Sequence, residues 1–77
     1  MQVTDHESEI VEAFRQNVLK RIDQEHLNKS ELCRRAKMSR AGFYSFLEGS
    51  GGITLAKAGN LAKAMGTTVE DLLQKHD

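Results

Sequence analysis

Apolar residues recur along the first third of this chain at the spacing of a helix. Ile10, Phe14, Val18 and Ile22 stand four residues apart. This period places them on one face of a helix, and we expect that helix over residues 8–25. The residues between them are mostly polar, so the opposite face of the helix is predicted to meet solvent.

Capping residues predict where four further helices begin and end. Ser, Thr and Asn are favoured just before a helix, because the side-chain oxygen accepts a bond from a free backbone N–H. Gly is favoured just after one, because it readily adopts positive φ. The expected N-caps are Asn28, Ser39, Thr54 and Thr68, and the expected stops are Gly49 and Gly66. The expected helices cover residues 29–36, 40–48, 55–65 and the segment that follows Thr68.

The predicted inward faces of these helices are apolar or small. Helices this short are marginal alone, so they must bury their apolar faces against one another. The prediction is a compact all-α domain of five helices. Its expected inward residues after the first helix are Leu27, Leu32, Cys33, Ala36, Met38, Phe43, Phe46, Leu47, Leu55, Ala58, Leu61, Ala62, Met65, Val69, Leu72 and Leu73.

The 77 residues are enough for one domain, which we place over residues 8–77. Residues 1–7 form an N-terminal extension that is either disordered or continues the first helix. They carry acids and no apolar run, so a signal peptide is not expected. No stretch approaches the ~18 apolar residues of a membrane span, so we expect no membrane partner.

Charge is distributed unevenly although the formal net charge is zero. Residues 1–12 contain four acids and neither Lys nor Arg, whereas residues 29–40 contain five basic residues and one acid, Glu31. Exposed charges act within about 8–10 Å at physiological salt, so local excess matters more than the sum. Residues 29–40 are therefore a candidate surface for a polyanion, although a merely solvated face is the alternative.

Chemistry other than binding has little support in the sequence. Cys33 is the only cysteine, which excludes an internal disulfide and fits a reducing cytoplasm. His6, His26 and His76 lie far apart without helix-spaced ligand partners, so no metal site is expected. No catalytic set or phosphate-binding glycine loop is present. We expect no enzyme activity and no cofactor.

The connection between the second and third expected helices has the length of a helix-turn-helix. Residues 37–39 are too few for antiparallel packing along both helices, and such turns commonly join helices at ~90–120°. With Phe43, Phe46 and Leu47 buried, the third helix would expose a strip that starts at its first residue. Such a strip can read bases in the major groove of DNA. The strip consists of Arg40, Ala41, Tyr44 and Ser45.

Each residue of the strip has an expected contact. Arg40 suits a bidentate contact to guanine, and Ala41 suits a thymine methyl group. Ser45 can reach a base or a phosphate, whereas Tyr44 is either a phosphate contact or a packed edge residue. Lys29, at the start of the second helix, is expected at a phosphate.

The stretch "LNKSELCRRAKMSRAGFYSFLEG" resembles the helix-turn-helix of the lambda-repressor-like, Cro/CI-type (XRE) regulators. The trailing "ITLAKAGNLAKAMGTTVEDLL" resembles their fourth and fifth helices, so the likeness covers about residues 18–73. It implies a DNA-binding fold whose second and third helices present their first residues to DNA. The residues that it implies are Asn28 and Lys29 at phosphates, and Ser39, Arg40, Ala41, Tyr44 and Ser45 on or near bases. Ser30 and Lys37 complete the candidate DNA-binding set, because they stay outside when the apolar positions of the two helices are buried.

The chain departs from that family at three places. Lys37 stands where the turn usually has Gly, which costs ~1 kcal/mol if its backbone is left-handed. Gly42 lies inside the third helix, where Gly is unfavourable. An ion pair common in the family, between the first helix and the end of the third, is replaced by Ile22 and Leu47.

These observations predict a bacterial, phage or plasmid regulator that binds double-stranded DNA and represses transcription. A homodimer on a palindromic operator is expected, with Val69, Leu72, Leu73 and the tail as its interface. The alternative is that these side chains belong to the core of the single domain. "SRAGFYSFLEGSGGITL" is also similar to some antitoxins of addiction modules, so an antitoxin that binds a toxin protein is one alternative. A helical protein-interaction module without DNA binding is another. The expected location is the cytoplasm, in association with the nucleoid.

Overall fold

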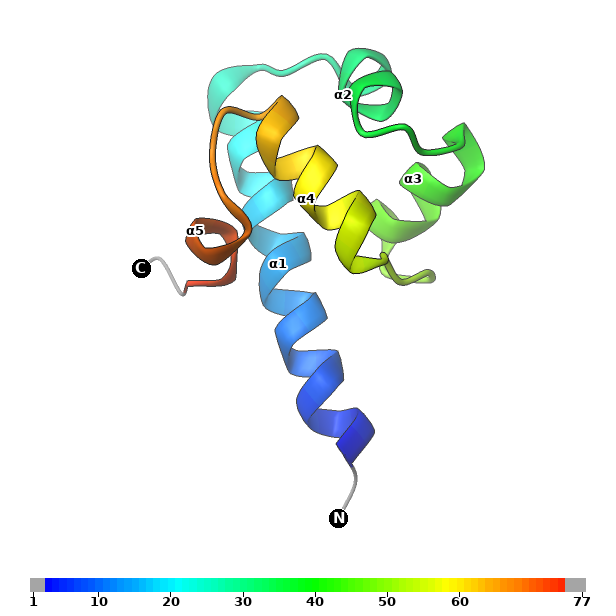
Figure 1. The fold of residues 1–77 in the computed structure, drawn as a ribbon, viewed down its shortest axis with the longest axis vertical. Helices are drawn as coiled ribbons and strands as arrows, with labels where there is room; N and C mark the ends of the chain where they lie inside the picture. Colours follow the sequence, from blue (N-terminus) through cyan, green and yellow to red (C-terminus); the bar gives the residue numbers. More distant parts are fainter. Residues whose placement is uncertain (1–2, 75–77) are drawn as a thin grey trace.

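The computed structural model describes the backbone of residues 3–74 and the side chains of residues 9–74. Within that range all the regular secondary structure is helical, which confirms the prediction of an all-α chain with five helices. The radius of gyration is 11.9 Å. The helices are α1 (Val3–Glu25), α2 (Lys29–Arg35), α3 (Arg40–Glu48), α4 (Leu55–Ala64) and α5 (Val69–Leu73). In Figure 1 the short helices gather at the C-terminal part of the long helix α1, which packs against α3 and α5.

The first helix starts earlier than residue 8, in agreement with the alternative that the N-terminal extension continues it. α1 begins at Val3, not at residue 8, so residues 3–7 continue the helix, and residues 1 and 2 lie outside the described part. The N-terminal half of α1 projects beyond the other helices (Figure 1). The other helix ends agree with the expected ones to within a residue or so, the usual uncertainty of such assignments.

The predicted caps are confirmed at all four N-termini. Each side-chain oxygen accepts a bond from the backbone N–H three residues on, at 2.9 Å for Asn28, 3.0 Å for Ser39, 3.2 Å for Thr54 and 3.1 Å for Thr68. Gly49 ends α3 with φ 88°, and Gly66 follows α4 with φ 75°. Both glycines therefore hold the left-handed backbone that most other residues avoid.

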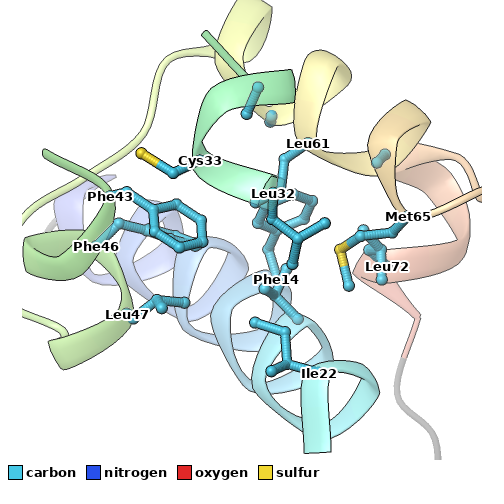
Figure 2. Close-up of a cluster of buried hydrophobic side chains, with 14 residues drawn as sticks. Phe14, Ile22, Leu32, Cys33, Phe43, Phe46, Leu47, Leu61, Met65 and Leu72 are labelled. Carbon is cyan, nitrogen blue, oxygen red and sulfur yellow. The ribbon is translucent and has the colours of Figure 1, made fainter. Parts of the chain in front are cut away.

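The core gathers apolar side chains from all five helices. Figure 2 shows Phe43 and Phe46 of α3 beside Phe14 of α1, with Leu61 of α4 nearby. The rings of Phe14 and Phe46 lie 5.9 Å apart at a tilted angle of 52°, which suits aromatic packing. The buried set is Phe14, Val18, Ile22, Leu32, Cys33, Ala36, Phe43, Phe46, Leu47, Ala58, Leu61, Ala62, Met65 and Leu72.

Three residues expected to face inward are exposed instead. Leu55 is 79% exposed, Ile10 is 44% exposed and Leu73 is 38% exposed. Leu55 and Leu73 stand at the ends of their helices, and Ile10 lies in the N-terminal half of α1, which projects beyond the other helices (Figure 1). All three line one apolar groove of about 210 Å³ between α1, α4 and α5.

Polar side chains of α1 hold α3 and α5 in place. Arg15 donates to the carbonyl oxygen of Leu47 at 3.0 Å, at the end of α3, and pairs with Glu12. Its hydrogen bond to Glu12 holds the pKa of that carboxyl below its ordinary value. Asn17 donates to the carbonyl oxygen of Leu72 at 2.5 Å and so anchors α5. Ile22 and Leu47, the expected apolar replacement for an ion pair, are both buried in the core.

Among the described residues, no helix combines the length and the apolar character that crossing a membrane requires.

Candidate nucleic-acid interface

The four residues that join α2 to α3, from Ala36 to Ser39, form a tightly bonded turn. The N–H of Lys37 donates to the carbonyl of Arg34, and the N–H of Met38 donates to the carbonyl of Cys33, both at 3.1 Å. The thiol of Cys33 also lies 3.1 Å from the Met38 carbonyl oxygen, and Met38 packs against the core. In Figure 1, α2 is seen nearly end-on while α3 runs across the view, so the two helices are far from antiparallel.

Lys37 has a left-handed backbone, with φ 60°. The cost of ~1 kcal/mol for a residue other than Gly in this conformation therefore applies here. Two polar side chains of α4 support this turn. The ammonium group of Lys57 donates a hydrogen bond to the carbonyl oxygen of Lys37. The side-chain amide of Asn60 donates one to the carbonyl oxygen of Ala36 at 3.2 Å. Sequence reasoning missed both contacts. The only signal is that these two polar residues stand three apart on a helix whose neighbouring positions, Ala58 and Leu61, are buried.

The leading end of α3 is exposed and its other face is buried. Phe43 and Phe46 are fully buried, which holds the helix against α1. Arg40 and Ala41 are exposed at the start of the same helix. The strip expected from the sequence is therefore open at its first two residues.

The later part of the strip is more covered than expected. Ser45 is half-buried, and its carbonyl accepts from the N–H groups of Ser50 and Gly51 at 3.0 and 3.1 Å. A Cβ placed on Gly51 would lie 3.1 Å from the Ser45 Cβ, so the loop after α3 lies directly on Ser45. Tyr44 is also half-buried, and its ring meets Phe43 edge-on at 5.7 Å. Tyr44 thus packs against the core, in agreement with its interpretation as a packed edge residue.

Two of the expected contact residues have structural roles as well. Asn28 and Ser39 are exposed, but their side-chain oxygens cap α2 and α3. A Cβ on Gly42 would lie 3.0 Å from the Ser39 Oγ, so the glycine leaves room for the cap. This accounts for Gly42 inside α3 without any reference to DNA. Ser30, also in the expected set, is exposed near the start of α2.

The basic residues divide into paired and unpaired groups. Glu31 pairs with both Arg34 and Arg35, the latter at 2.9 Å, so one acid serves two cations. Lys29, Lys37 and Arg40 are exposed and form no ion pair within residues 9–74. The region around the turn therefore keeps a net positive charge that can attract an anion. Among the described side chains, no three His, Cys, Asp or Glu residues come together as metal ligands would.

Replacing Ser39 separates its capping role from any contact with DNA. Ser39→Ala should lower the free energy of unfolding by about 1 kcal/mol, because the cap is lost. Ser39→Asp should keep the cap, and its charge also suits the helix N-terminus. If α3 binds DNA, Ser39→Asp should nevertheless bind it more weakly, because the carboxylate faces phosphates. Urea unfolding and fluorescence anisotropy with DNA measure the two effects, and equal DNA affinity of Ser39→Asp and the parent would exclude this docking.

No protein-family model matches the chain, and neither a curated protein nor a solved structure does. The likeness to the lambda-repressor-like regulators therefore stays a prediction from the motifs. The function is inferred from the turn, from α3 and from the charges around them.

Proposed function

We propose that this protein binds double-stranded DNA in a sequence-specific manner and represses transcription. The observation that carries the proposal is the exposed start of α3, with Arg40 and Ala41 open while Phe43 and Phe46 are buried. A helix anchored along one face and free at its leading end can enter the major groove. Arg40 would bind guanine through two hydrogen bonds, and Ala41 would contact a thymine methyl.

Phosphate contacts are proposed for the cations on either side of that helix end. Lys29 at the start of α2 and Lys37 in the turn are exposed and have no ion pair within residues 9–74. Contacts of this kind place a protein on DNA and set its orientation without reading the sequence. Base reading is assigned to Arg40 and Ala41, with Ser45 reduced to a minor role by the loop above it.

A homodimer is part of the proposal, because one domain of this size contacts only a half-site. The expected interface needs revision, since Leu72 is 2% exposed and is used in the core. Val69 and Leu73 remain, and they line the groove that also includes Ile10 and Leu55. A second copy that covers this groove would remove from water the three large apolar side chains that are exposed within residues 9–74, Ile10, Leu55 and Leu73.

Footprinting on the DNA upstream of the gene, with a salt titration of the affinity, tests the function. A two-fold dimer should protect two half-sites one helical turn apart, ~34–36 Å. The logarithm of the binding constant should fall linearly with the logarithm of salt concentration, by about 0.9 per phosphate contacted. Protection of one half-site alone would contradict the dimer. Binding that is insensitive to both sequence and salt would contradict the proposed function.

An antitoxin is the second candidate, and the apolar groove is the observation that favours it. The groove has about 210 Å³ for the apolar side chains of a protein partner. Co-expression with a small basic protein encoded beside the gene tests this candidate. A stable complex that Leu55→Glu abolishes would support it, whereas the absence of any complex would oppose it. A helical interaction module without DNA binding, the remaining alternative, predicts no salt-dependent binding to any duplex.

A further inference from the structure

A second basic feature lies beside the turn, in a hollow between the end of α2 and α4. The hollow measures about 370 Å³. Figure 1 places α2, the first residues of α3 and the C-terminal end of α4 at the same end of the molecule, away from the start of α1. The residues that line the hollow are Arg35, Lys37, Asn60, Lys63 and Ala64.

The lining of this hollow is positively charged. Three of its five residues are cations, and none is an acid. Arg35 pairs with Glu31, but Arg34 shares that acid. Lys37 and Lys63 form no ion pair within residues 9–74. Like charges that converge on a concave surface concentrate the local field and favour a bound anion.

The backbone of Lys37 is a second and independent indication. Its φ of 60° is a conformation that Gly adopts at little cost and that side chains with a Cβ disfavour. A strained residue that persists where Gly would fit suggests that its side chain has a use. That side chain lines the hollow.

The bonds beneath the hollow remove an obstacle to anion binding. The C-terminal carbonyls of a helix carry partial negative charge and repel anions. At the end of α2, Asn60 donates to the Ala36 carbonyl and Lys57 donates to the Lys37 carbonyl. These two oxygens are therefore hydrogen-bonded, and every charged side chain that lines the hollow is a cation.

We propose that this hollow binds a backbone phosphate of the DNA that flanks the half-site read by α3. The inference rests on the proposed function and adds Lys63 and Arg35 to the phosphate contacts. Lys37 belongs both to the turn before α3 and to the hollow, so the two surfaces are continuous. A phosphate held here extends the contact with DNA beyond the reach of α3 itself.

Two substitutions, each with a matched control, test the proposal by fluorescence anisotropy. Binding is measured to a long duplex, which contains the half-site and its flanking DNA, and to a trimmed duplex, which ends at the half-site. Lys63→Ala should bind the long duplex severalfold more weakly, with a salt slope reduced by about 0.9, the value of one phosphate contact. On the trimmed duplex it should bind like the parent. Lys20→Ala on α1 is the control, because Lys20 lines neither the hollow nor the exposed strip.

Lys37→Gly gives an effect that a purely structural role would not produce. It should raise the thermal midpoint, because the left-handed backbone suits Gly, and yet weaken binding to the long duplex. His26→Gly is the matched control, since His26 also has a positive φ, of 53°, but does not line the hollow. It should raise the midpoint and leave DNA binding unchanged.

The remaining outcomes distinguish failure of the hollow as a phosphate contact from failure of the proposed DNA-binding function. If Lys63→Ala matches the parent on both duplexes while Arg40→Ala loses discrimination, the hollow is not a DNA contact and the proposed function stands. If the parent shows no salt-dependent binding to any duplex, the proposed function itself fails. A titration with inorganic phosphate, monitored by NMR, tests whether the hollow binds a free phosphate ion instead of a phosphate of DNA. Saturable shifts at Lys37 and Lys63, with unchanged DNA binding in Lys63→Ala, would reassign the hollow to a free anion and overturn the proposal.

Discussion

Leu61→Ala should lower the free energy of unfolding by about 2–5 kcal/mol, the range for truncating a buried leucine. Leu61 is fully buried among the core residues of α4. The substitution removes the transfer free energy of three carbon atoms and leaves a cavity that the surrounding helices fill only in part. Small domains have a total stability of roughly 5–15 kcal/mol, so this single change can leave much of the protein unfolded at 37 °C.

Leu55→Ala is the matched control, because it is the same substitution on the same helix. Leu55 is 79% exposed at the first position of α4, so at protein concentrations where the chain is a monomer its truncation should change the stability by less than ~0.5 kcal/mol. Urea unfolding followed by circular dichroism measures both variants. Similar losses for the two leucines would mean that the groove around Leu55 is closed in solution, for instance by a second copy of the chain. A dependence of the Leu55→Ala loss on protein concentration would identify that second copy.

Arg40→Ala should reduce the discrimination at one base pair by about 1–3 kcal/mol, the value of a bidentate arginine–guanine contact. Arg40 is exposed at the first position of α3 and forms no ion pair within residues 9–74. Its removal should therefore leave the folded state nearly unchanged. Competition binding with operator variants, mutated one base pair at a time, measures the loss and identifies the position.

Two controls separate base reading from general attraction. Lys29→Ala should weaken binding to all sequences alike and reduce the salt slope by about 1, as expected for a phosphate contact. Arg34→Ala removes an exposed arginine of α2 that pairs with Glu31, and it should not change base discrimination. If Arg40→Ala bound every operator variant like the parent, α3 would not be the reading helix.

Local sequence was sufficient to predict the five helices and all their boundaries except the start of the first. The caps at Asn28, Ser39, Thr54 and Thr68 all form as expected, because an N-cap bond joins residues only three positions apart. The left-handed backbone of Lys37 was raised only as a condition, from the resemblance to a family whose turn usually has Gly at this place. Local sequence did not determine the start of α1, because no strong breaker separates residues 3–7 from the rest of the helix.

Sequence was less informative about which helix faces are covered. Periodicity assigned Ile10, Leu55 and Leu73 to inward faces, and the structure exposes all three. Periodicity shows which side of a helix is apolar, but coverage depends on where the neighbouring helices end. Ser45 was misjudged for the related reason that the loop at Gly51 returns onto α3.

The sequence by itself determined the all-α class, the five helices, their caps and the excess of positive charge at residues 29–40, since each depends on neighbours within a few positions. Only the tertiary structure decided that Arg40 and Ala41 stay open while Ser45 is covered. It also decided that Lys57 and Asn60 support the turn, and that Lys63 joins Lys37 around a basic hollow. The contacts of Lys57, Asn60 and Lys63 join residues 20 or more positions apart, so they depend on how the helices pack, whereas Ser45 is covered by the path of the loop that follows α3.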